Sequence, residues 1–176
     1  IVLKRHPEKY PDFKVQNICA NGELWTGKGT VNVAMCRVGW NMTADDIYFG
    51  VKGGGCTFSH SHMDAGSFVF DALGQRWSED YQRPNYATFE NYLKKDGGDF
   101  WNVGQTSLRW DIVKMNSYGH STLVFKTNDG RVNKLHPTDQ ICSGVATIEA
   151  VYNNDPDNLG VKINLSQIYA DAAASV

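Results

Sequence analysis

Short runs in which apolar and polar residues alternate follow one another along most of the chain, and turn-like stretches rich in glycine, asparagine and aspartate separate them. β-Branched and aromatic residues are frequent within the runs, as is typical of half-buried strands. The pattern predicts strands over residues 31–40, 46–51, 67–72, 75–80, 107–113, 121–126, 131–134, 145–152 and 160–164. At least eight short strands with turns between them favour an all-β fold, an antiparallel β-sandwich.

Two of the intervening turns predict β-hairpins. Leu73-Gly74 separates 67–72 from 75–80, and Asn128-Asp129-Gly130 separates 121–126 from 131–134. Residues 81–104, by contrast, are polar and contain Pro84, Gly97 and Gly98. We expect a long loop there, with a helical turn near residues 88–94. Loops of this length in compact domains are usually functional or disordered.

The two ends of the chain differ from its middle. Residues 1–30 are polar and irregular, and we expect a linker or edge segment there, followed by one β-sandwich domain over residues 31–176. A chain of 176 residues has room for one sizeable core. The C-terminal stretch from Ile168 onward consists of apolar and small residues, a composition that we expect to run on into further sequence. We therefore expect this chain to be an incomplete fragment of a larger sandwich domain.

Charge and hydropathy exclude some partners. The 17 lysines and arginines nearly balance the 19 aspartates and glutamates, which does not favour a partner such as nucleic acid or a membrane surface. No apolar run approaches the roughly 20 residues of a membrane span, and the first residues lack the pattern of a signal peptide. An anionic ligand therefore requires a local basic groove.

The four cysteines, Cys19, Cys36, Cys56 and Cys142, are far apart and form no CxxC pair. This spacing excludes a zinc ribbon and a thioredoxin-type redox motif. The cysteines are either buried free thiols or, in an oxidising compartment, disulfide-bonded. Four cysteines allow three complete pairings, and the sequence does not choose among them.

The densest group of reactive side chains follows Gly53-Gly54-Gly55 and comprises His60, His62 and Asp64. In an extended segment, residues i and i+2 face the same side, so the two histidines are predicted to converge on one metal ion or one substrate atom. A pair of hydrogen-bonded structural histidines is the alternative. Asp64 either orients a histidine by accepting its hydrogen bond or stabilises a turn.

Residues 59–80, SHSHMDAGSFVFDALGQRWSED, resemble the heparinase II/III family of polysaccharide lyases, in which a His-x-His-x-Asp-x-Gly-x-Phe motif leads into a hairpin and then an aspartate. Four further segments are similar to strands of that family: VAMCRVGW at 33–40, WN at 101–102, QTSLRW at 105–110 and YGHSTL at 118–123. The resemblance covers about residues 31–125. Ser59 and Ser121 depart from it, because relatives often place asparagine at these two positions.

The resemblance implies roles for individual residues. His60 would face the sugar as a catalytic residue, and zinc would be bound by His62, Asp80 and His120. Because a hairpin at Leu73-Gly74 pairs Asp80 with residues near Phe68, the chain must bend between Met63 and Gly66 for these ligands to meet.

The resemblance also implies a reaction, a partner domain and a location. Family members cleave polysaccharides that contain uronic acid, such as heparin and heparan sulfate, by β-elimination. Part of their catalytic machinery comes from a preceding helical toroid domain, which this chain lacks, so the chain alone is expected to be inactive. A periplasmic or secreted location follows from the same resemblance.

Substrate contacts and rival functions complete the expectations. Arg109 alternates with Ser107 in a predicted strand and is expected either to bind a carboxylate or sulfate of the acidic polysaccharide or to be an arginine on the surface of the sandwich. Tyr86 is expected to stack on a sugar, or else to be an exposed loop tyrosine. One rival is a cupin-like metal protein, although the glutamate that follows the histidines in a cupin motif is missing. The other is a non-catalytic carbohydrate-binding or structural sandwich.

Overall fold

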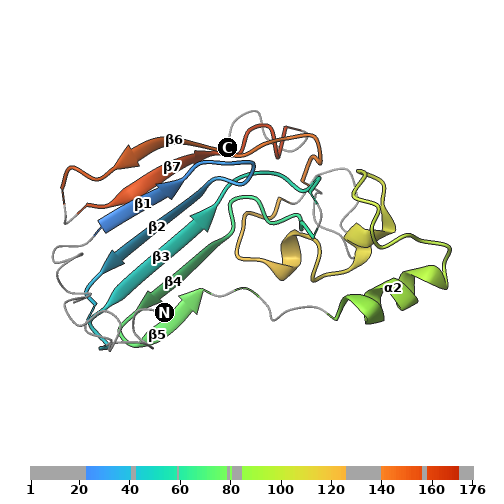
Figure 1. Cartoon of the computed structure of the whole chain (residues 1–176), viewed down its shortest axis with the longest axis horizontal. Helices are drawn as coiled ribbons and strands as arrows, with labels where there is room; N and C mark the ends of the chain where they lie inside the picture. The colour runs from blue at the N-terminus through green and yellow to red at the C-terminus, as the bar shows by residue number, and fades with distance from the viewer. Residues whose placement is uncertain are drawn as a thin grey trace, which may run out of the picture.

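The computed structural model describes residues 23–40, 43–58, 60–78, 80, 85–125, 140–155 and 158–170. Its main feature is a five-stranded antiparallel sheet with the strand order β1-β2-β3-β4-β5, which is also the order along the chain (Figure 1). The strands are β1 (Glu23–Gly27), β2 (Val33–Val38), β3 (Ile47–Lys52), β4 (Phe68–Ala72) and β5 (Gln75–Ser78). Each strand therefore pairs with its neighbour in sequence.

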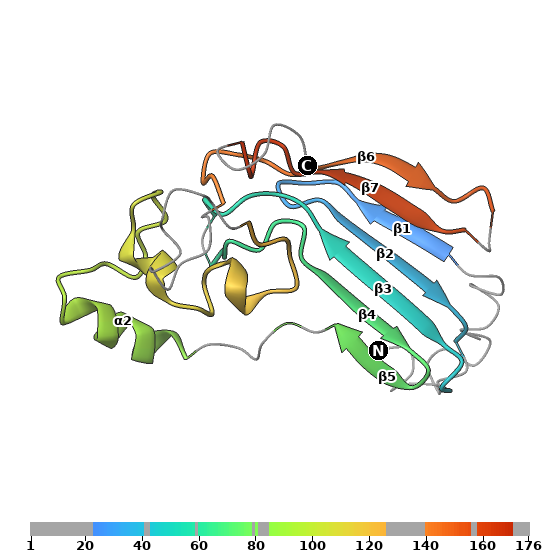
Figure 2. The same ribbon diagram turned by 180° about the vertical axis from the view of Figure 1, so that it is seen from behind.

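A second sheet contains two antiparallel strands, β6 (Thr147–Tyr152) and β7 (Gly160–Asn164). It runs along the β1 side of the larger sheet in both opposite views (Figure 2). The two sheets are connected by an isolated antiparallel bridge between Gly54, which lies just beyond β3, and Ala146, which directly precedes β6. The predicted antiparallel all-β class is confirmed, whereas the face-to-face packing of a sandwich stays a prediction.

Residues 85–125 form an irregular lobe at one end of the five-stranded sheet (Figure 1). Helix α2 (Tyr86–Lys94) begins at Asn85, whose side chain caps it by accepting a hydrogen bond from the Thr88 amide. Two short 3₁₀ helices follow, η3 (Leu108–Asp111) and η4 (Ser117–Gly119). Within the described part of the chain, no helix combines the length and apolarity that crossing a membrane requires.

The predicted hairpin at Leu73-Gly74 is confirmed. Both residues have positive φ angles, 54° and 70°, as in the type I′ turns that join two-residue hairpins. Ala72 pairs with Gln75, and the register shifts between Phe70 and Asp71. The second predicted hairpin, at 128–130, lies outside the described residues.

The predicted strand over 107–113 is wrong, because the segment contains η3 instead. The Ser107 side chain accepts a hydrogen bond from the Arg109 amide and caps this 3₁₀ helix. Arg109 and Trp110 are both buried, although adjacent residues in a strand face opposite sides. Residues 121–125 are not a strand either.

A compact core lies beneath the irregular lobe. It contains buried residues from the His60 region, from α2, from the 100–115 segment and from the segment that precedes β6: Cys56, Met63, Leu93, Phe100, Trp110, Ile112, Met115 and Cys142. A smaller cluster joins Ala65 to Ala146, Leu165, Ile168 and Tyr169. The segment that carries the two motif histidines runs between these two cores.

Candidate metal centre

The chain turns sharply where the histidine motif enters β4. Gly66 has a φ of +78°, a conformation that L side chains rarely adopt. Its amide donates to the Lys52 carbonyl at 2.8 Å, and the Lys52 amide donates to the Ser67 carbonyl at 3.0 Å. The bend that the sequence required between Met63 and Gly66 is therefore present.

Hydrogen bonds hold the motif against the segment that carries His120. The Met63 amide donates to the Met115 carbonyl at 2.8 Å, and the Ser117 hydroxyl donates to the Met63 carbonyl at 3.0 Å. Ser117 opens η4, and His120 follows directly after this helix. His62 and His120 are consequently brought to the same place.

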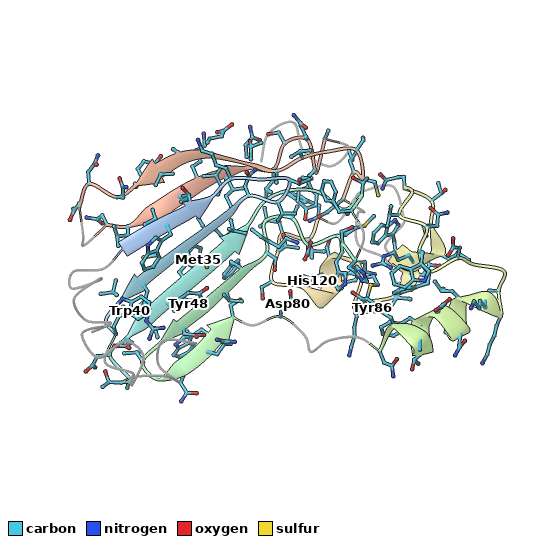
Figure 3. All side chains as sticks on the ribbon, viewed as in Figure 1. Met35, Trp40, Tyr48, Asp80, Tyr86 and His120 are labelled. Atoms are coloured by element: carbon cyan, nitrogen blue, oxygen red, sulfur yellow. The ribbon has the colours of Figure 1, made fainter. Side chains whose placement is uncertain are left out.

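The hairpin brings Asp80 to the same region. The Phe68 amide donates to the Ser121 carbonyl at 3.1 Å, which sets the His120 segment beside the start of β4. The Ser78 hydroxyl donates to the Phe68 carbonyl at 3.2 Å across the hairpin. Asp80, two residues further on, thus lies beside His120 (Figure 3).

Three side chains form a group that can hold a metal ion: His62, Asp64 and His120. One ligand atom from each lies within 4.8 Å of the others, and His62 Nδ1 is 3.1 Å from His120 Nε2. Two imidazole nitrogens and a carboxylate oxygen are a common donor set for divalent transition metals. Two of the three residues expected to bind zinc are in this group.

Asp80, the third expected ligand, contacts the opposite nitrogen of His120. Its carboxylate oxygens lie 2.7 and 2.8 Å from His120 Nδ1. Because a carboxylate accepts hydrogen bonds, this contact favours a proton on Nδ1 and leaves the Nε2 lone pair directed toward His62. Asp80 as a direct ligand stays a prediction.

The electrostatic environment favours neutral His62. Burial lowers the pKa of His62 to about 4; the Asp64 carboxylate opposes this shift, and His120, Arg109 and Lys52 add to it. The ring is therefore uncharged at neutral pH, which is the form that binds metals.

Lys52 forms an ion pair with Asp64 that the sequence did not indicate. Its ammonium nitrogen lies 2.7 Å from the Asp64 carboxylate. Lys52 ends β3, and no motif near it signals this contact. The pair holds Asp64 in place at the metal-binding group.

His60 does not share the surroundings of His62. Its φ of +64° places it in the left-handed region, which is uncommon for residues other than glycine. The exposed ring stacks on Tyr86 with centroids 5.5 Å apart, and its centroid lies 5.3 Å from that of Trp101 in an edge contact. The prediction that the two histidines share one face of an extended segment is wrong, because the left-handed residue breaks the alternation.

Arg109 was expected to face a substrate groove, but its exposed fraction is 0%. Its guanidinium donates to the Phe100 and Ser61 carbonyls at 2.8 and 2.7 Å. Burial lowers the pKa of Arg109. The residue therefore organises the loop around His60 and does not reach the surface.

Tyr86 is the first residue of α2 and is half-buried. Its ring packs between His60 and Phe100, with the Phe100 centroid 5.3 Å away. The more exposed aromatic residue is Trp101, at 44%. The predicted loop over residues 81–104 is rich in aromatic residues, and this is the signal by which the sequence could have indicated an aromatic cluster. Nothing in the sequence indicated that these aromatic residues pack around His60.

No protein-family model matches the chain, and no curated protein matches it. The family resemblance therefore stays a prediction that rests on the motif residues. What the fold defines is an antiparallel β protein with a partly buried two-histidine, one-carboxylate group, and with an exposed histidine that packs against aromatic neighbours.

Proposed function

We propose that this chain is the zinc-binding β portion of a polysaccharide lyase resembling heparinase II/III, and that the enzyme cleaves a uronic-acid-containing polysaccharide by β-elimination. One observation carries the proposal. The family resemblance implies three zinc ligands, which come from separate segments: His62, Asp80 and His120. In the structure His62 contacts one ring nitrogen of His120, and Asp80 contacts the other.

Zinc suits the group on chemical grounds. It favours tetrahedral sites with nitrogen and carboxylate donors, and His62 and His120 supply two nitrogens. Asp64 or Asp80 would provide the carboxylate and water the fourth position. Bound there, zinc would hold the motif segment to the His120 segment and supply positive charge near the substrate.

The substrate side of the proposal rests on His60. Elimination removes the proton at C5 of the uronate and protonates the departing oxygen at C4, so it requires a base, an acid and stabilisation of the carboxylate. His60 is exposed and lies beside the exposed Trp101, which can stack on a sugar ring, while the half-buried Tyr86 packs against the His60 ring. We propose that His60 transfers a proton or stabilises the intermediate, and that a helical domain of the parent protein supplies the remaining groups. The polymeric substrate favours a periplasmic or secreted location.

The metal part is tested by zinc content. We expect the purified chain to bind about one equivalent of zinc, measured by atomic emission after gel filtration. His62→Ala and His120→Ala should lose the metal, because each removes a nitrogen donor. His60→Ala is the matched control and should retain the metal. If His60→Ala alone releases the metal, both motif histidines are ligands and the cupin-like alternative gains support.

The catalytic part is tested on the full-length parent protein. Ultraviolet absorbance of the unsaturated product is followed across heparin, heparan sulfate and other uronate polymers. We expect turnover on at least one polymer, and at least a hundredfold loss in His60→Ala with zinc content unchanged. Binding of a polymer without unsaturated product would refute the lyase proposal and favour the non-catalytic alternative, which the exposed Trp101 also suits.

A further inference from the structure

Two of the cysteines lie together in the larger core. The side chains of Cys56 and Cys142 are buried, with exposed fractions of 1% and 6%. Both belong to the cluster that surrounds Met63, Trp110 and Met115. The Cys142 side chain lies near enough to the Cys56 thiol to raise its pKa.

The backbone explains why these segments approach so closely. Gly54 and Ala146 exchange two backbone hydrogen bonds, each 2.9 Å long. At the next residue, a Cβ added to Gly55 would lie 2.5 Å from the Gly144 carbonyl oxygen, so only glycine permits the approach. Cys56 comes one residue after Gly55, and Cys142 comes two residues before Gly144, so both cysteines lie next to this contact.

Cys36, the other cysteine among the described residues, lies elsewhere. It is in β2, where it pairs with Leu24 of β1 and Phe49 of β3. It belongs to neither core cluster. Cys19 lies outside the described residues.

We propose that Cys56 and Cys142 form a disulfide when the protein folds in the presence of a disulfide oxidant. The two thiols lose two protons and two electrons and form one S–S bond. A low-molecular-weight disulfide such as oxidised glutathione accepts these electrons and protons and becomes two thiols. Of the disulfide pairings that the sequence left open, the structure thus selects the one between Cys56 and Cys142. This inference does not depend on metal binding.

The reaction is expected during folding and not afterwards. Two main causes raise the pKa of the Cys56 thiol: the larger is the neighbouring Cys142 side chain, and the smaller is burial. A protonated, buried thiol is a poor nucleophile, so the folded dithiol form is unreactive. Once formed, the bond is shielded from reducing agents in the same way.

The bond would anchor the segment that leads to the histidine motif. The Ser61 hydroxyl donates to the Cys56 carbonyl, and the Ser61 carbonyl accepts from Arg109 at 2.7 Å. A disulfide at Cys56 would therefore fasten the start of the His60 loop to the segment around Cys142. The disulfide would also close a long loop of chain. Cross-links that close long loops destabilise the unfolded state more than those that close short loops.

The test is refolding of the whole chain in a buffer of reduced and oxidised glutathione, followed by alkylation of the free thiols in denaturant and by peptide mapping without reduction. We expect two of the four cysteines to escape alkylation and one cross-linked peptide pair, containing Cys56 and Cys142. The melting temperature should exceed that of protein refolded in excess reductant by roughly 5–15 °C. Cys36→Ser, the control, should behave like the wild type, whereas Cys142→Ser should show neither effect.

The proposal is overturned if all four cysteines are alkylated after oxidative refolding, or if the cross-link contains Cys19 or Cys36. Should Cys142→Ser not fold, the peptide map of the wild-type chain decides alone. The outcome is independent of zinc, since refolding is carried out with a chelator present.

Discussion

At the scale of single residues, two aspartates approach the histidine pair from different sides. Asp64 is buried within the metal-binding group and paired with Lys52, whereas Asp80 contacts the outer nitrogen of His120. The geometry favours Asp64 as a direct ligand and Asp80 as the group that orients His120. The motif resemblance assigned the direct role to Asp80.

Replacing each aspartate by asparagine separates these roles. Asp64→Asn should weaken zinc binding more than about 100-fold, since it removes a donor, and Asp80→Asn by about 10–100-fold, since it removes an orienting contact. Competition with a chelating dye measures both affinities. Lys52→Met removes the ion pair but keeps the Asp64 carboxylate, so it should weaken zinc binding less than Asp64→Asn does. A larger loss in Asp80→Asn would restore Asp80 as the ligand.

Arg109 illustrates a second residue-scale effect, because a buried cation depends on its hydrogen-bond acceptors. Arg109→Met would leave the Phe100 and Ser61 carbonyls without these donors. We expect a loss of about 2–4 kcal/mol in the free energy of unfolding. Urea denaturation measures this loss.

The matched control is Arg76→Met, which breaks an ion pair with Asp71 whose side chains are 50% and 32% exposed. This change should cost less than about 1 kcal/mol, because exposed pairs contribute little. Equal effects of the two substitutions would show that burial of Arg109 is not important for stability.

At the scale of elements, the turn at Gly66 directs the motif into β4. In Gly66→Ala the new Cβ would lie 2.8 Å from Leu165 Cδ1, and the φ of +78° would be strained. The expected loss of stability is about 2–4 kcal/mol, from backbone strain and overpacking together. Gly97→Ala is the control, since its φ is +72° but nothing lies within 4 Å.

Gly97→Ala should therefore cost only the strain, about 1 kcal/mol. Thermal and urea denaturation compare the two variants. A similar cost at both positions would mean that contact with Leu165 adds nothing to the requirement for glycine at position 66.

The elements also show what the sequence can predict. The hairpin at Leu73-Gly74 was predictable because turn and strand signals are local. The 107–125 segment was not, because Ser107 and Asn116 satisfy backbone amides with their side chains and replace strand pairing by 3₁₀ turns. The conformation of His60 and the burial of Arg109 depend on contacts with Tyr86, Trp101 and Phe100, which alternation along one segment cannot reveal.

At the scale of the whole molecule, a bound ion would stabilise the fold by joining distant segments. Zinc at 100 times its dissociation constant adds about 2.7 kcal/mol to the free energy of unfolding, which corresponds to a rise of roughly 5–10 °C in melting temperature. We expect a chelator to reverse this rise, and scanning calorimetry to record it. His62→Ala should not respond to zinc or to chelator. If neither zinc nor chelator changes the melting temperature of the wild-type chain, the metal proposal is contradicted.

The pairing of His62 with His120 joins residues 58 positions apart, and Gln140 binds the Ala65 backbone across 75 positions. Contacts of such long sequence separation form late in folding, because closing large loops costs chain entropy before any contact is gained. We therefore expect the ion-binding group to be complete only near the end of the folding reaction. A metal ion should therefore slow unfolding while leaving the rate of folding almost unchanged.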